Sequence, residues 1–173
     1  MNVLEPLRID LKGLHEGGDV FEADLDDAFF EAVGSREVSG GRLHVSLSVR
    51  KTSGFFDLTS HVAGVVRVAC GLCLEDMDLP IEADNHVTVR LGSRETMDDD
   101  VVTVDENEGI LDASWLVYEF IVLAIPIRHV HAPGKCDPAM TKVLEELSSD
   151  RSSGEESSGA VDSRWSELLK LKD

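Results

Sequence analysis

Basic residues are scarce in this sequence. Its 173 residues include 16 Lys and Arg but 34 Asp and Glu, which gives a formal net charge of −18 and a pI near 4.5. Proteins that bind nucleic acids non-specifically hold the phosphates with Lys and Arg side chains. The charge balance therefore argues against broad nucleic-acid binding and favours partners that are basic, cationic or metallic.

Segments for export or membrane insertion are also missing. Residues 1–6 contain neither the basic stretch nor the apolar stretch of a signal peptide. The longest apolar run, residues 110–127, is interrupted by Asp112, Glu119 and Pro126 and is too short and too polar to cross a bilayer. We therefore expect a cytoplasmic protein that does not contact a membrane.

Cysteines are few, and familiar catalytic motifs are missing. Three cysteines cannot form a closed set of disulfides, and in a reducing cytosol a C-x-x-C pair is typical of metal binding or redox activity. The sequence contains no G-x-S-x-G nucleophile motif, no Walker A motif and no G-x-G-x-x-G motif. We therefore expect no enzymatic activity.

Alternation of apolar and polar residues predicts a protein rich in strands. Residues 26–36 predict one short helix that ends at Gly34. Five segments follow the two-residue period of a half-buried strand, the first two more weakly: residues 3–11, 19–25, 43–49, 54–70 and 79–91.

A second predicted helix, residues 114–125, is largely apolar. It follows Asp112 and Ser114, either of which can accept hydrogen bonds from the free N–H groups of a first helical turn. Pro126 ends the helix because it disfavours the α conformation at the preceding residue. A helix this apolar must be buried. The sequence thus predicts an α+β domain over residues 1–147, with a mostly antiparallel sheet or a partly open barrel and one buried helix.

Two polar stretches interrupt this pattern. Residues 95–108 hold seven acidic residues and no basic one, and the strand-like residues 101–104 interrupt them. The stretch lacks the spacing of an EF-hand, so we expect a solvated acidic loop rather than a calcium or magnesium site. Residues 148–159 are mostly Ser, Gly and acidic residues, a composition typical of a flexible linker.

A short helix is predicted at residues 160–173. Trp165, Leu168 and Leu169 have the i, i+3, i+4 spacing of one apolar helix face. Two interpretations of this apolar face stay open. It can dock on its own domain, or it can bind a partner as a tethered helix.

Cys70 and Cys73 lie in the turn between two predicted strands. Their two-residue gap lets both sulfurs bind one ion about 2.3 Å away, as in zinc knuckles. Cys136 is the third cysteine, although 62 residues separate it from Cys73. The hypothesis is a zinc site formed by Cys70, Cys73, His131 and Cys136, with His129 as the alternative to His131.

Two other interpretations of these cysteines stay open. The pair is compatible with a tight turn whose thiols are partly buried, because Cys is a common core residue. A thioredoxin-like redox pair fits less well, since that pair opens a helix, whereas Cys70 and Cys73 join two strands.

Five features follow one another along the chain: a strand that enters Cys70-Gly-Leu-Cys73, a Leu79-Pro-Ile strand, an acidic loop, a helix that ends in Ile125-Pro-Ile, and a closing Asp162-Ser-Arg-Trp165. In this order they resemble the YceD family, the bacterial large ribosomal RNA subunit accumulation proteins, long known as a domain of unknown function. Many members have further cysteines after the Pro-ended helix. This sequence has only Cys136 there, beside His129 and His131, which favours a Cys3His site over a four-cysteine site.

The resemblance implies a cytosolic, non-enzymatic factor that is needed for accumulation of large-subunit ribosomal RNA. The net charge of −18 favours a basic ribosomal protein or assembly factor as the partner, with ribosomal RNA contacted only indirectly or within a ribonucleoprotein. The alternative is a zinc-binding or thiol-redox protein centred on Cys70, Cys73 and Cys136. A third class is a hydrolase with an unrecognised active site, and the absence of the catalytic motifs named above argues against it.

Overall fold

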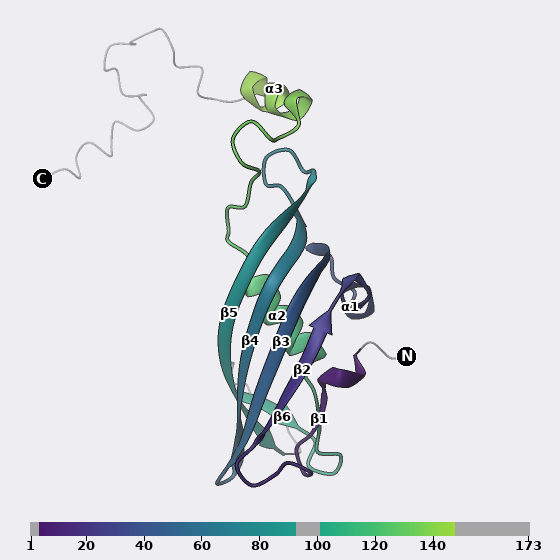
Figure 1. The fold of residues 1–173 in the computed structure, drawn as a ribbon, viewed down its shortest axis with the longest axis vertical. Helices are drawn as coiled ribbons and strands as arrows, with labels where there is room; N and C mark the ends of the chain where they lie inside the picture. Colours follow the sequence, from purple (N-terminus) through teal and green to yellow (C-terminus); the bar gives the residue numbers. More distant parts are fainter. Residues whose placement is uncertain (1–3, 93–100, 148–173) are drawn as a thin grey trace, which may run out of the picture. The chain divides into compact units, whose positions relative to one another are not determined.

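The computed structural model describes residues 4–92 and 101–147 (Figure 1). The chain divides into two compact units after Asp137, so the residues before this point and the helix after it are described separately. Along the chain the elements are η1 (Glu5–Leu7), β1 (Arg8–Asp10), β2 (Asp19–Leu25), α1 (Asp27–Val33), β3 (Val38–Thr52), β4 (Phe55–Ala69), β5 (Asp76–Leu91), β6 (Val101–Val104), β7 (Ile110–Asp112), α2 (Ser114–Leu123) and α3 (Pro138–Leu147).

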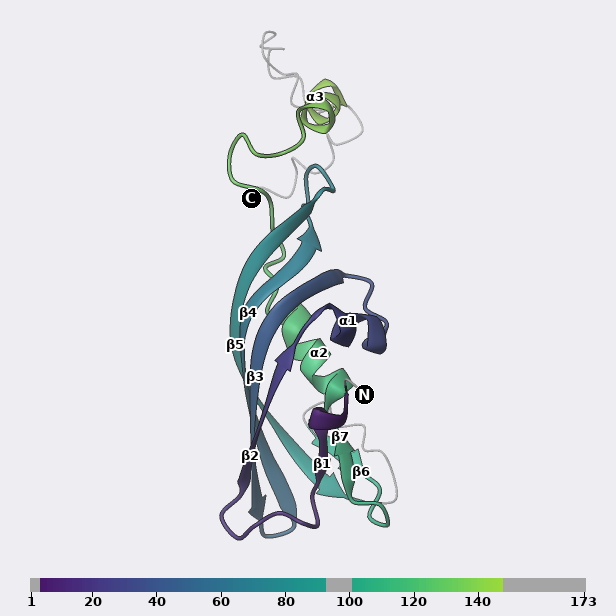
Figure 2. The same cartoon turned by 45° about the vertical axis from the view of Figure 1, so that its right-hand side comes forward.

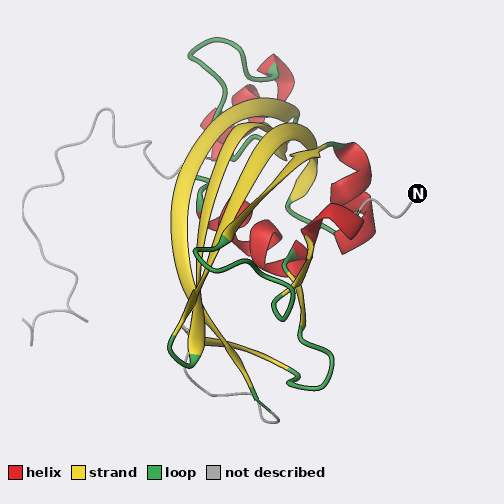
Figure 3. Ribbon diagram, turned by 60° about the horizontal axis from the view of Figure 1, so that its bottom comes forward, coloured by secondary structure: helices red, strands yellow, loops and turns green. Residues whose placement is uncertain are grey.

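The main sheet has five strands in the order β2-β3-β4-β5-β6. Strands β2 to β5 are antiparallel neighbours, and β6 runs parallel to β5. The three central strands are 15, 15 and 16 residues long, and they curve together (Figure 2, Figure 3). Across the described residues the sheet stays open, with β2 and β6 at its edges. The predicted α+β class with a mostly antiparallel sheet is confirmed.

The core lies between the sheet and α2. Alternate residues of the long strands are buried, as their two-residue period predicts, and α2 lies across this face of the sheet (Figure 2). Each fully buried Val or Ile contributes about 1.5–3 kcal/mol, so the sheet and the helix stabilise one another. Fully buried members of this core include Val45, Val49, Leu58, Val62, Val117 and Ile121.

Gly64 allows β3 and β4 to pack closely. It lies opposite Leu43 in the ladder and has a φ of 151°, a conformation that side chains disfavour. A Cβ at this position would collide with the backbone of Arg42 and Leu43. Glycine is therefore required where the two long strands approach each other.

The helix predicted over residues 26–36 is confirmed as α1. The Asp26 side chain caps it by accepting a hydrogen bond from the backbone N–H of Ala28 at 3.0 Å. Gly34, with a φ of 70°, ends it in the left-handed conformation. Phe29 and Phe30 point into the core and anchor the helix.

The predicted apolar helix is confirmed as α2, but it is buried on one face only and its ends differ slightly from the prediction. Its N-cap residue is Ala113, which has no capping side chain; the Asp112 carboxylate instead accepts from the backbone N–H of Ser114 at 3.0 Å. The helix ends at Leu123 rather than at residue 125. Val117, Phe120 and other residues of one face are buried, as the apolar composition predicts.

Several elements differ from the sequence patterns. The predicted strand over residues 3–11 is only the three-residue β1, because η1 with its Pro6 precedes it. Strand β1 pairs with β7 in a separate antiparallel sheet. The patterns above predict neither β7 nor α3. Helix α3 has no buried residue.

Three predictions fall wholly or partly outside the described residues. These are the linker at 148–159, the C-terminal helix at 160–173, and the first part of the acidic stretch, residues 95–100. The domain boundary at residue 147 therefore stays a prediction. None of the described helices is both long enough and apolar enough to span a membrane.

The face of the main sheet away from α2 carries cross-strand charge pairs. Nδ1 of His44 on β3 lies 2.8 Å from Oδ1 of Asp24 on β2, and Nδ1 of His61 on β4 lies 2.8 Å from Oδ1 of Asp84 on β5. The hydrogen bond to Asp24 raises the pKa of His44 above its ordinary value. This face is polar and solvated rather than apolar.

Candidate metal centre

The turn between β4 and β5 places Cys70 and Cys73 side by side. The backbone N–H of Leu74 donates to the carbonyl of Cys70 at 3.0 Å, and the N–H of Cys70 donates to the carbonyl of Glu75 at 2.8 Å. Leu74 has a φ of 63°, the left-handed conformation that reverses the chain here. Both cysteines are buried although the turn joins two strands near the surface.

A second segment, residues 126–136, reaches this turn from the end of α2. The backbone N–H of Gly71 donates to the carbonyl of His129 at 2.9 Å, which fixes the segment beside the turn. A Cβ on Gly71 would lie only 3.2 Å from that carbonyl oxygen, so the small residue favours the close approach. This backbone contact brings His131 and Cys136 to the two cysteines.

Cys70, Cys73, His131 and Cys136 converge on one point. One possible ligand atom from each residue lies within 4.8 Å of those of the other three. Sγ of Cys70 is 3.9 Å from Sγ of Cys136, and Nδ1 of His131 is 3.3 Å from Sγ of Cys73 and 4.0 Å from Sγ of Cys136. The structure therefore brings together all four residues of the predicted site.

These spacings agree with tetrahedral zinc coordination. With Zn–S bonds of about 2.3 Å and Zn–N bonds of about 2.0–2.1 Å, two sulfurs of a tetrahedron lie about 3.8 Å apart and a sulfur and a nitrogen about 3.6 Å apart. The separation of 3.9 Å between the sulfurs of Cys70 and Cys136 is close to the first value, and the sulfur–nitrogen separations of 3.3 and 4.0 Å lie on either side of the second. The donor set, three sulfurs and one imidazole, is one that zinc prefers.

Backbone N–H groups favour the thiolate form of the C-x-x-C pair. Burial opposes ionisation of Cys70, but hydrogen bonds from the N–H groups of Cys73, Leu72 and His131 outweigh it and lower the pKa of Cys70 to about 5. The N–H groups of Leu72 and His131 both lie 3.4 Å from its sulfur. The pKa of Cys73 is lowered as well, first by a hydrogen bond from the N–H of Asp137. Thiolates are the form in which cysteines bind metals.

The other two candidate ligands respond to these thiolates. Burial and the neighbouring Cys70 and Cys73 raise the pKa of Cys136 to about 11. The hydrogen bond to Cys73 raises the pKa of His131. A divalent cation between the four side chains would offset the repulsion among the sulfurs. Binding of a metal would release the protons of Cys136 and His131, because cysteine and histidine bind metals in their deprotonated forms.

His129, the alternative fourth ligand, has a different contact. Its Nδ1 donates to the carbonyl of Pro126 at 2.8 Å, and it does not belong to the group of converging ligand atoms. Its role is in the backbone, where its carbonyl accepts from Gly71. His131 is therefore the histidine that the structure brings to the cysteines.

The arrangement favours a structural metal site over a redox site. All four coordination positions are supplied by the protein, which is typical of structural zinc, whereas catalytic zinc keeps one position open. Cys70 lies in a turn and does not begin a helix, unlike the reactive cysteine of a thioredoxin-like pair. Sequence reasoning missed the supporting backbone, namely the N–H donors and Gly71, because donors of this kind leave no signature in side-chain identity.

Most of the chain is similar to a known protein family. Residues 58–172, about two thirds of the chain, match the family described as Large ribosomal RNA subunit accumulation protein YceD. The matched range includes all four residues of the candidate metal centre. No curated protein and no solved structure matches the chain.

Proposed function

The chain belongs to the YceD family of large ribosomal RNA subunit accumulation proteins, and from this premise we propose that it is a non-enzymatic factor in the accumulation of large-subunit ribosomal RNA. The family match is the observation that carries the proposal. In this proposal the protein acts in the cytoplasm, through contacts with a protein or a ribonucleoprotein, and catalyses no reaction on the RNA.

The charge of the chain supports a basic protein as its direct partner. A net charge of −18 repels the phosphates of free RNA and attracts the basic proteins that assemble with it. Complementary charge mainly speeds encounter and selects the partner. The proposed partner is therefore a basic ribosomal protein or assembly factor.

Zinc binding at Cys70, Cys73, His131 and Cys136 is a second part of the proposal. The spacing of the four ligand atoms supports it. When bound, zinc would act as a structural cross-link. The protein itself positions the ligands. The backbone N–H groups around Cys70 orient its sulfur, and the hydrogen bond between Gly71 and His129 holds the two segments together.

Removal of the protein from cells that produce it tests the proposed function. The amount of mature large-subunit ribosomal RNA should fall relative to small-subunit ribosomal RNA, and expression of the wild-type protein should restore it. Purification of the tagged chain from the same cells should recover basic ribosomal or assembly proteins. Precursor RNA should be recovered only while these proteins remain bound to the chain. An unchanged RNA ratio would refute the proposal.

A further inference from the structure

Helix α2 is apolar on the side that faces solvent as well as on the side that faces the core. Trp115 is 57% exposed and Leu123 is 78% exposed, and Ile127, just after the helix, is fully exposed. A helix that is hydrophobic on all sides is normally buried on all sides. Large apolar side chains in a row on a surface mark a site of interaction.

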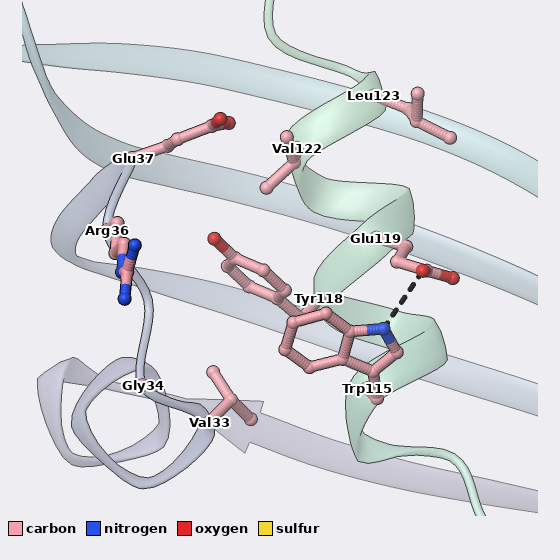
Figure 4. Close-up of a pocket in the computed structure, with 9 residues that line it drawn as sticks. All are labelled: Val33, Gly34, Arg36, Glu37, Trp115, Tyr118, Glu119, Val122 and Leu123. Carbon is pink, nitrogen blue, oxygen red and sulfur yellow. Dashed lines mark hydrogen bonds between the residues drawn. The ribbon is translucent and has the colours of Figure 1, made fainter.

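This exposed side lines a groove. A cavity of about 760 Å³ separates α2 from the turn after α1 (Figure 4). A second cavity of about 380 Å³ shares Arg36, Glu37 and Val122 with the first and extends along the chain to Ile127. We call the first cavity the α2 groove, and define it by Val33, Glu37, Trp115, Tyr118, Glu119 and Leu123.

Carboxylates flank the apolar surface of the α2 groove. Glu119 lies between Trp115 and Leu123 on the exposed side of the helix, and Glu37 extends from the opposite wall (Figure 4). Nε1 of Trp115 donates to Oε1 of Glu119 at 2.9 Å, which holds the carboxylate beside the indole ring. A cation placed here would meet both a carboxylate oxygen and an aromatic face.

Charge decides among the possible occupants of the α2 groove. RNA is disfavoured because two carboxylates face it against the single guanidinium of Arg36. A second copy of the chain is disfavoured because each copy carries a net charge of −18. A segment with apolar side chains for the groove and Lys or Arg for its carboxylates matches both features.

We propose that the α2 groove binds an amphipathic basic segment of the partner protein, with apolar residues spaced by three or four positions and flanked by Lys or Arg. The proposal rests on the proposed function, since it assigns a surface to the basic partner. Apolar contact with Trp115 and Leu123 supplies affinity, and Glu37 and Glu119 select a basic sequence over an acidic one.

The test uses the full chain with Trp165→Phe, so that Trp115 is the only tryptophan, and a helical peptide of about 18 residues made of Leu and Lys with Leu on one face. Binding is followed by Trp115 fluorescence. We expect saturable binding that is about tenfold weaker in Leu123→Asp and less sensitive to salt in Glu119→Gln. Val20→Asp is the matched control, because Val20 is 62% exposed on the sheet face away from α2.

Specific outcomes would overturn the proposal. If a peptide with the same pattern but Glu in place of Lys binds equally well, the groove does not select basic segments. Binding that Leu123→Asp leaves unchanged would place the peptide elsewhere, and the ribosomal RNA ratio in cells would still test the proposed function separately. A change of Trp115 fluorescence in full-chain Leu168→Asp without peptide would identify the C-terminal segment as the occupant. Self-association that Leu123→Asp abolishes would identify a second copy.

Discussion

The candidate metal centre unites residues that lie far apart in the sequence, and a backbone hydrogen bond between Gly71 and His129 holds their two segments together. The C-x-x-C spacing of Cys70 and Cys73 can be read directly, since two residues fix the distance between the sulfurs. The approach of Cys136 across 62 intervening residues could not be derived from spacing, because it depends on where α2 ends and on the backbone contact between Gly71 and His129. The choice of His131 over His129 depends on the same contact.

Replacement of Cys70 tests the metal centre. Protein prepared without chelator should carry about one zinc per chain, and Cys70→Ser should lose it. The free energy of unfolding should fall by at least about 3 kcal/mol, because metal-binding energy at a structural site is also folding energy. Elemental analysis and thermal unfolding measure the two effects.

His131→Ala and His129→Ala form a matched pair for the same site. The first should lose zinc, and the second should retain it, since Nδ1 of His129 is engaged by the carbonyl of Pro126. Equal zinc content in both variants would contradict the assignment of His131. Zinc-free wild-type protein with the same melting temperature as Cys70→Ser would contradict the metal centre itself.

The pair of His44 and Asp24 predicts a pH effect. Because Asp24 raises the pKa of His44 in the folded protein, the pair contributes stability below the unfolded-state value of about 6.5 and loses it as pH rises through the folded-state pKa. Asp24→Asn should lower the pKa of His44, as measured by NMR titration, and should weaken the decrease of stability between about pH 6 and pH 8. Asp84→Asn, on a different pair, should leave the titration of His44 unchanged.

Secondary-structure elements were predictable where side chains alternate over many residues. The strands β3, β4 and β5 follow the two-residue period because one face of each is buried against α2. Short elements carry too little periodicity, so the three-residue β7 was missed and β1 was predicted too long. The exposed side of α2 was also unpredicted, because its composition alone indicates burial on every side.

Gly64→Ala tests the close packing of the long strands. A methyl group there would meet the backbone of Arg42 and Leu43, and the φ of 151° would strain the new residue. The free energy of unfolding should fall by at least about 2 kcal/mol. Gly92→Ala is the control, since a Cβ at Gly92 makes only an ordinary contact of 3.4 Å with Thr103. Equal stability of the two variants in chemical denaturation would refute the requirement for glycine.

At the scale of the whole molecule, sequence motifs predicted the family that the chain belongs to, whereas the basic character of the partner stays a prediction from composition. The order of the C-x-x-C turn, the Pro-ended helix and the closing Trp165 element identified the family that residues 58–172 match. Fold class followed from periodicity and was confirmed. The identity of the partner is not encoded in composition, because charge specifies the sign of a complementary surface and not its shape.

The acidic character of the chain predicts its behaviour toward RNA and toward basic proteins. The purified protein should bind ribosomal RNA weakly at physiological salt, because its carboxylates repel phosphates within the screening distance of about 8 Å. Affinity for purified basic proteins of the large subunit should be measurable and should fall as salt rises. Asp98→Asn, Asp99→Asn and Asp100→Asn together remove three negative charges and should weaken this affinity while the melting temperature stays the same. Strong, salt-sensitive binding of the isolated protein to RNA would contradict this prediction, because a local basic patch of Arg36, Arg42, Arg50 and Lys51 would then have to override a net charge of −18.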